Sequence, residues 1–323
     1  MSKKPIKILL YILTALLLAV GVGIFVYPLV SANISENQSQ NAIQSFENYK
    51  QAHIKNNFEN NSDKEECTPE QKSDETLLKL YNEMQSYNEQ IYREKQSGLC
   101  DAWSYEQTAV DLTEYGLGDC PVCVLRVPQM KINMPLYLGA SYNNMSKGAT
   151  QLGETSMPIG GINTNCVIAG HRGWNGARYF LDIESLSIGD RVFIDNLWET
   201  LEYSVSEIKI INPDDIDAVK IQDGKDMVTL FTCHPYWDST YRYAVFCTRV
   251  YDDNNNLQND TQNNSQSTLQ TTVQPQLTDE NSVADTSETR IKIEQTSYYI
   301  IPIALVLLAL VLFLMNHRKK NKK

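Results

Sequence analysis

The chain has 323 residues and a formal net charge of −11, with 42% hydrophobic and 21% charged residues. Its positive charge is concentrated at the ends, with three lysines in the first thirty residues and five basic residues in the last eight. Taking these charges away leaves residues 31–297 with a net charge of −19. A segment this acidic repels nucleic acid and anionic lipid, so we exclude nucleic-acid binding.

Two apolar segments are long enough to cross a membrane. Residues 8–30 and 298–315 contain no charged side chain. At about 1.5 Å of rise per helical residue they span roughly 35 and 27 Å, close to the ~30 Å of a bilayer core. The basic residues nearest to each segment lie on its terminal side, so the positive-inside rule predicts cytoplasmic termini and an extracellular middle. A cleaved signal peptide is the alternative for residues 8–30, but their apolar run exceeds the usual ~7–15 residues, and Ser31-Ala-Asn is a poor cleavage site.

Seven cysteines on an exported domain raise the question of disulfide bonds. An odd total fits one functional thiol, and it also fits a protein without disulfides in an organism that lives without oxygen. Cys120-Pro-Val-Cys123 has the spacing of half a zinc site. No second pair and no His-x3-His motif accompanies it, so we expect no metal there.

Two helices are expected after the first apolar segment. Residues 36–60 are polar with scattered apolar positions, and predict a helix that leaves the membrane. The second helix starts at Ser73 or Asp74, runs to about Gln96 and ends by Gly98. Its apolar residues recur every three or four positions, as one buried stripe requires. They are Leu77, Leu80, Tyr81, Met84, Tyr87, Ile91 and Tyr92.

From residue 122 the pattern changes to short runs rich in β-branched and aromatic residues, separated by turn residues. The main runs are 122–127, 132–137, 166–169, 192–194, 200–211, 227–231 and 241–250. About eight strands at this spacing predict a closed, mostly antiparallel barrel. The predicted fold class is therefore mostly β: an eight-stranded closed β-barrel with two N-terminal helices and a transmembrane helix at each end.

A cysteine, an arginine and a histidine lie at predicted strand ends. Pro235 prevents one strand from continuing, so the thiol of Cys233 lies where a loop begins. Arg242 opens the next strand, and the two side chains suit a nucleophile and a cation that holds a carbonyl oxygen. His171 follows another strand and is the best general acid among the four histidines. His234 is a poor partner for Cys233, because adjacent strand residues point to opposite faces.

These motifs together resemble the sortase family. Thr229-Leu-Phe-Thr-Cys-His-Pro-Tyr followed by Arg242 resembles the sortase active-site strand with its downstream arginine, and Ala169-Gly-His-Arg-Gly resembles the sortase histidine segment. Within the family the chain looks most like the class C, pilin-polymerising sortases, over about residues 125–250. The supporting segments are 157–161, 177–180 and 213–215, and a second, C-terminal anchor is also a class C trait.

The resemblance also implies a lid over the cysteine. Class C sortases carry an Asp-Pro-aromatic motif before the barrel, and Asp101-Ala-Trp103 stands at that place. Ala102 departs from the usual proline, which predicts a less rigid lid. An ordinary loop with an anchoring tryptophan is the alternative. A second departure is Ser239-Thr-Tyr-Arg242, where class C chains often have Asn-Thr-His-Arg; the rim differs and the arginine stays in register.

The reaction that the resemblance implies is a transpeptidation. Cys233 as thiolate attacks the Thr–Gly carbonyl of an LPxTG-like sorting signal, His171 protonates the departing amine, and Arg242 steadies the carbonyl oxygen or the bound peptide. A lysine of a neighbouring pilin subunit then resolves the thioester, which leaves an isopeptide bond. No cofactor and no metal is expected. Some relatives bind calcium near the acidic segment 212–224, which we interpret as a solvated loop.

The predicted organisation has seven parts. They are a cytoplasmic N-terminus (1–7), a transmembrane helix (8–30), a helical region with the lid at 101–103 (31–121), the catalytic barrel (122–252), a disordered polar linker (253–297), a second transmembrane helix (298–315) and a basic cytoplasmic tail (316–323).

The protein is thus expected in the cell membrane of a Gram-positive organism, multi-pass, with its catalytic domain outside. Its expected partners are pilin or surface-protein substrates, the acceptor lysine and membrane lipid. Three alternatives stay open: a housekeeping sortase that anchors proteins to peptidoglycan, a hydrolase using the same thiol, and a catalytically silent membrane-tethered binding protein.

Overall fold

The computed structural model describes residues 4–54, 69–99, 108–174, 177–236 and 239–251, together with residues 304, 307 and 308. The chain divides into two compact units, of which the second comprises residues 37–174 and 178–277 and contains every strand. The strands are β1 (Cys123–Val127), β2 (Ile132–Leu138), β3 (Ala149–Gln151), β4 (Thr164–Ala169), β5 (Arg191–Asn196), β6 (Thr200–Ile211), β7 (Asp226–His234) and β8 (Tyr241–Arg249). The helices are α1 (Lys4–Ile54), α2 (Pro69–Arg93), α3 (Tyr142–Met145) and the 3-10 helices η3 (Leu112–Tyr115), η4 (Pro128–Met130), η5 (Ile183–Ser185) and η6 (Ile216–Val219).

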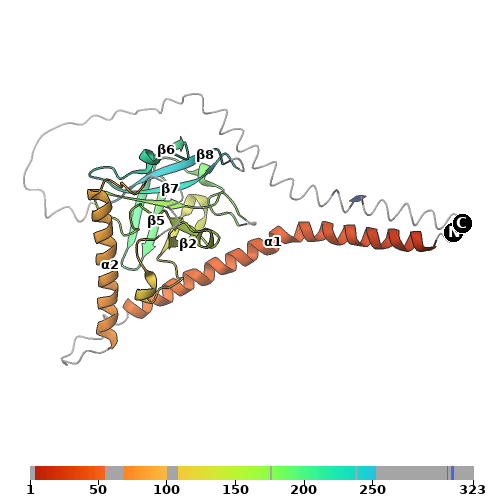
Figure 1. Cartoon of the computed structure of the whole chain (residues 1–323), viewed down its shortest axis with the longest axis horizontal. Coiled ribbons are helices and arrows are strands. Elements are labelled where there is room, and N and C mark those ends of the chain that lie inside the picture. The colour runs from red at the N-terminus through yellow and green to blue at the C-terminus, as the bar shows by residue number, and fades with distance from the viewer. Residues whose placement is uncertain are drawn as a thin grey trace, which may run out of the picture. The chain divides into compact units, whose positions relative to one another are not determined.

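The eight strands form a closed barrel in the order β1-β2-β3-β4-β7-β8-β6-β5, which confirms the predicted barrel (Figure 1). The pairs β2–β3 and β4–β7 are parallel and the other six are antiparallel. The sequence did not predict β3, because its three residues are all buried and show no alternation of apolar and polar side chains.

The three neighbouring strands β4, β7 and β8 are covered on both faces near their middle. Leu230 and Val245 belong to one face and are fully buried. The other face carries Ala169, Phe231 and Ala244, which pack in a separate apolar cluster. Burial on both faces explains why β7 appears in the sequence as a continuous apolar run rather than an alternating one.

Helix α1 is one continuous helix, where the sequence indicated an apolar span followed by a separate polar helix. Its part from residue 37 onward belongs to the unit that contains the barrel. There Phe46 is fully buried, Tyr49 donates a hydrogen bond of 2.7 Å to the carbonyl of Tyr115, and Lys50 donates to the carbonyl of Asn196. This end of α1 is therefore fixed to the barrel by polar contacts as well as by apolar burial.

Among the described residues, α1 is the one helix that is long and apolar enough to cross a membrane. The second predicted span, 298–315, and the predicted linker, 253–297, lie outside the described residues except for positions 304, 307 and 308.

Helix α2 buries the predicted apolar stripe, since Leu77, Leu80, Met84 and Ile91 are all buried. One polar residue belongs to the same stripe. Asn88 is 5% exposed, and its side-chain oxygen accepts a hydrogen bond of 2.7 Å from the backbone N–H of Met157. Asn88 thus satisfies a buried backbone group that an apolar side chain at this position would leave unpaired.

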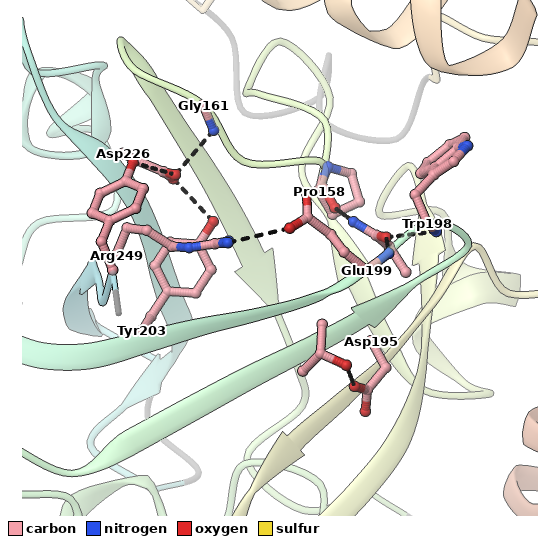
Figure 2. Close-up of polar contacts among 11 residues, drawn as sticks. Pro158, Gly161, Asp195, Trp198, Glu199, Tyr203, Asp226 and Arg249 are labelled. Carbon is pink, nitrogen blue, oxygen red and sulfur yellow. Dashed lines mark hydrogen bonds and ion pairs between the residues drawn. The ribbon is translucent and has the colours of Figure 1, made fainter. Parts of the chain in front are cut away.

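The first residue of β7, Asp226, is the centre of a polar cluster (Figure 2). Its carboxylate accepts hydrogen bonds from the N–H of Gly161 and the hydroxyl of Tyr203, both 3.0 Å long. The guanidinium of Arg249 lies over the Tyr203 ring and pairs with Glu199 at 3.4 Å. These contacts fix the beginning of β7 and the end of β8.

At the opposite end of the barrel, Gly170 follows β4 with little room for a side chain. A Cβ atom at this position would lie 2.9 Å from the ring of Phe180, which is fully buried. The glycine therefore lets the chain that leads into His171 pass against this ring.

We expect Gly170→Ala to destabilise the protein by about 1–3 kcal/mol, because the buried ring has no free space to enter. Chemical denaturation of the full chain measures the effect. Phe180→Leu makes room at the same spot, so the double variant should lose less stability than the sum of the two single variants. Additive losses would contradict the steric explanation.

Candidate active site

Strand β7 places its end between two neighbours that carry the other predicted site residues. In the antiparallel pair β7–β8, Cys233 lies directly opposite Arg242. In the parallel pair β4–β7, Ala169 lies opposite Phe231, and the N–H of Gly170 donates a hydrogen bond of 3.1 Å to the Phe231 carbonyl. His171 and Cys233 are each two positions beyond that pair. The register thus brings His171, Cys233 and Arg242 to the same end of three adjacent strands.

Cys233 and His234 point to opposite faces of β7, as predicted. Cys233 is partly exposed and continues the face of Phe231. His234 is fully buried, and its Nδ1 lies 2.8 Å from Arg172 Nη1 and 3.1 Å from Glu184 Oε1. His234 is therefore occupied by internal contacts on the face away from the thiol.

Partial exposure distinguishes Cys233 and Cys120 from the other three described cysteines. Cys123, Cys166 and Cys247 are buried, and desolvation raises the pKa of each thiol well above its ordinary value. Since the thiolate is the nucleophile, these three are poor nucleophiles. All five described cysteines are free thiols, and no group of His, Cys, Asp or Glu in the described residues is arranged to hold a metal.

His171 is half-buried against two aromatic rings. Its imidazole stacks on Trp174 with the centroids 4.6 Å apart and meets the edge of Tyr179 at 6.1 Å. Desolvation lowers its pKa below the ordinary value of about 6.5, because burial penalises the imidazolium. The Nε2 atom is buried and has no hydrogen-bond partner within the described residues. A histidine held in this way can give and take a proton without being tied to a structural acceptor.

Arg242 is held by the turn that precedes it. Its Nη1 donates hydrogen bonds to the carbonyls of Ser239 and Tyr241, at 2.8 and 3.0 Å. A guanidinium has five N–H donors in a rigid plane, so these two bonds orient the group while it still offers donors to an oxygen. The lid residues Asp101 and Trp103 lie outside the described residues.

Three residues that the sequence did not single out belong to this end of the barrel. Trp174 covers the His171 ring. Arg172 and Glu184 form an ion pair beneath the site. Arg172 could be suspected from its position beside His171, whereas nothing in the sequence around Glu184, in η5, distinguishes it from an ordinary surface carboxylate.

The family model described as "Sortase domain" matches residues 125–250, a range that contains His171, Cys233 and Arg242. Residues 125–250 therefore match the sortase family. Sortase A of Bacillus anthracis is 29% identical over 121 residues, which are 38% of this chain and 56% of the relative. Sortase D of Bacillus subtilis is 24% identical over 130 residues, or 39% of this chain and 63% of the relative. The chain therefore spans about half the length of the curated relatives it matches.

Solved sortase structures share the fold. Sortase C1 of pilus island 1 from Group B Streptococcus aligns with a TM-score of 0.55 and 24% identity, over 66% of this chain and 99% of that one. Sortase C-1 of Streptococcus pneumoniae aligns with a TM-score of 0.51 and 24% identity, over 65% and 99%. These alignments cover more of the chain than the 126 residues that the family model matches.

We expect the pKa of His171 to lie below 6.5 and to rise toward it in Trp174→Ala. Removing the indole admits water to the imidazole, and water stabilises the charged form. The titration of labelled histidines by NMR in the full chain measures both values. Trp198→Ala is a matched control, because Trp198 packs against Tyr81 and not against His171. A His171 pKa that does not change in Trp174→Ala would show that the indole does not desolvate it.

Proposed function

We propose that this chain is a membrane-anchored cysteine transpeptidase that cleaves LPxTG-like sorting signals between Thr and Gly and joins pilin subunits through isopeptide bonds to lysine. The observation that carries the proposal is the strand register. It brings a partly exposed thiol, a histidine and an arginine together at one end of a sortase barrel.

The proposed reaction has two acyl-transfer steps. The thiolate of Cys233 attacks the Thr carbonyl carbon, and the resulting oxyanion is stabilised by the guanidinium of Arg242. The C–N bond to glycine breaks as the imidazolium of His171 gives its proton to the departing amine, which leaves a thioester. A lysine amine then attacks the thioester, His171 takes the excess proton, and Cys233 leaves again as thiolate.

The protonation states limit the rate of this mechanism. The reaction needs a cationic His171 together with an anionic Cys233. Because burial lowers the pKa of His171, only a small fraction of the imidazole is protonated near pH 7. The active form is therefore a minor population, and a fall in activity is expected on both sides of an optimum.

Three observations favour polymerisation of pilins over the anchoring of proteins to peptidoglycan. Two solved structures that share the fold, described above, are sortase C1 enzymes, and one of them is from a pilus island. The alignment with each covers about two thirds of this chain, which is more than the 126 residues that the family model matches. The sequence also provides a second apolar span and a lid motif. Helix α1 supports membrane anchoring, and we propose that both termini are cytoplasmic and the barrel is outside.

We expect Cys233→Ala to abolish cleavage and polymer formation, and His171→Ala or Arg242→Ala to reduce the rate by about 10²–10⁴-fold. The measurement is the formation of high-mass ladders from purified pilin by the full-length enzyme in detergent. Cys120→Ala removes another partly exposed thiol and should leave the ladders unchanged.

Each rival function has its own outcome in this assay. Normal ladders from Cys233→Ala would overturn the assignment. Cleavage of the sorting signal without capture of an added amine would indicate a hydrolase. Capture of a peptidoglycan-like amine with no ladders would indicate a housekeeping enzyme, and no reaction at all would indicate a silent binding protein.

We also propose that Asp101 and Trp103 form a lid, with Asp101 paired to Arg242 and Trp103 over Cys233. Replacing both residues with alanine should speed alkylation of Cys233 severalfold, because the thiol loses its cover. Mass spectrometry of the Cys233 peptide measures the rate. The control Trp198→Ala should label at the rate of the unmodified chain, and an unchanged rate in the double variant would contradict the lid.

A further inference from the structure

A buried polar cluster lies behind the thiol, on the face of β7 that points away from Cys233. We call it the Arg172 cluster; it consists of Arg172, Glu184, His234 and Tyr243. Arg172 is 5% exposed and His234 is fully buried. The proposed chemistry uses none of these four side chains, although two of them are the sequence neighbours of His171 and Cys233. Buried polar groups are costly unless they are paired, so this arrangement calls for an explanation.

Arg172 connects the end of β4 to the end of β7. Its Nη1 donates a hydrogen bond of 3.3 Å to the backbone carbonyl of Cys233 and lies 2.8 Å from Nδ1 of His234. Its Nη2 forms an ion pair with Oε1 of Glu184, and its guanidinium lies over the ring of Tyr243 at 5.9 Å. A single side chain thus contacts the nucleophile's own backbone and three side chains around it.

The carboxylate of Glu184 stays ionised although it is partly buried. Burial alone would raise the pKa of Glu184, but hydrogen bonds from His234 and Arg172, together with the charge of Arg172, lower it overall. Burial, and to a smaller extent the charge of the same carboxylate, raises the pKa of Tyr243 to about 12. Glu184 is therefore an ionised partner that fixes Arg172 in one orientation.

The contacts of Arg172 continue the link between β4 and β7 beyond the last paired residues. The ladder ends at Ala169 opposite Phe231. Gly170 then donates its N–H to the Phe231 carbonyl at 3.1 Å and accepts a hydrogen bond of 2.7 Å from the hydroxyl of Thr232. The bond from Arg172 to the Cys233 carbonyl is the next link along the same seam. The donor of this hydrogen bond, Arg172, immediately follows His171 in the chain.

We propose that Arg172, held by Glu184 and His234, is a positioning residue that sets the separation between His171 and Cys233. It acts by tying the segment that carries His171 to the backbone of the nucleophile from the opposite face of the sheet. This inference rests on the proposed function for its kinetic consequence, while its geometric consequence is measured without any sorting signal.

The decisive variant is Arg172→Lys. Lysine keeps the positive charge for Glu184 but lacks the planar fork, so it cannot hold the carboxylate, His234 and the Cys233 carbonyl together. For the folded variant we expect kcat for cleavage of a sorting peptide to fall at least tenfold, with KM changed less than twofold. A loss in kcat alone indicates misplaced reacting groups rather than lost substrate contacts.

The second readout is the coupling between His171 and Cys233, which needs no substrate. The dependence of the Cys233 alkylation rate on pH gives the apparent pKa of the thiol. We define the coupling as the change in this apparent pKa that His171→Ala causes. We expect this coupling to shrink by at least half in the Arg172→Lys background, because an electrostatic interaction weakens as the two groups separate. Mass spectrometry of the Cys233 peptide keeps the signals of the other cysteines apart.

Arg249→Lys is the matched control. Arg249 is also a mostly buried arginine over tyrosine rings with a glutamate partner. Figure 2 shows it beside Tyr203 and reaching toward Glu199. It lies seven positions along β8 from Arg242, which is roughly 23 Å at ~3.3 Å per strand residue. Arg249→Lys should lower the stability of the fold and leave both kcat and the coupling within twofold of the unmodified chain.

A pair of variants at His234 keeps the test open if Arg172→Lys does not fold. The described contacts of this histidine are made through Nδ1, and Nε2 has no partner among the described residues. The amide of asparagine reaches about as far as Nδ1, whereas that of glutamine extends toward Nε2. His234→Asn should therefore retain more than half of kcat and of the coupling, and His234→Gln should lose both.

Four outcomes overturn the proposal. They are a coupling that is absent from the unmodified protein, a coupling that survives Arg172→Lys intact, an equal loss of kcat in Arg249→Lys, and equal behaviour of the two His234 variants. Failure of the unmodified chain to cleave any sorting peptide would instead overturn the proposed function, and the coupling measurement would still test the position of Arg172.

Discussion

The pairing of β7 with a parallel neighbour on one side and an antiparallel neighbour on the other is the constraint on which the site depends. Parallel pairing with β4 aligns the ends of two segments about sixty residues apart, and antiparallel pairing with β8 returns the chain to the same end within nine residues. A shift of one residue in either register would turn one of the three side chains to the opposite face. The hydrogen bonds that fix the register therefore also fix which side chains meet.

Two arginines secure the two ends of this central part of the sheet. Arg249 lies over Tyr203 near Asp226, where β7 begins, and Arg172 contacts His234, where β7 ends. Each arginine is largely buried and has a glutamate partner. In the Arg172–Glu184 pair both side chains are mostly buried, so removing either partner would leave a poorly solvated charge, at a typical cost of about 3–5 kcal/mol. A buried ion pair adds little net stability, but it requires one particular arrangement of the two charged groups. That selectivity matters most at the end where Cys233 and His171 lie.

Much of this arrangement was predictable from the sequence, and the rest was not, for physical reasons. The barrel followed from strand spacing, and the thiol at a strand end followed from Pro235. The meeting of His171 with Cys233 depends on strand order, which spacing does not determine; the family resemblance supplied it. The role of Glu184 could not be predicted from the sequence. Its burial arises only when η5 folds over the end of the barrel, and a single carboxylate in a short helical turn has no characteristic sequence pattern. The continuity of α1 was also missed, since its change from apolar to polar residues resembles a boundary.

The alternation of strand residues explains how one short segment can serve chemistry and support at once. Cys233 and His234 are neighbours in sequence and point to opposite faces, so the thiol is partly exposed while the imidazole is buried. At the end of β4, His171 lies half-buried against the rings of Trp174 and Tyr179, and Arg172 is buried behind the sheet. In both pairs the residue proposed for the reaction is followed directly by a residue that can hold its backbone. A substitution in the buried partner is thus expected to act through position, and its effect on rate should exceed its effect on substrate affinity.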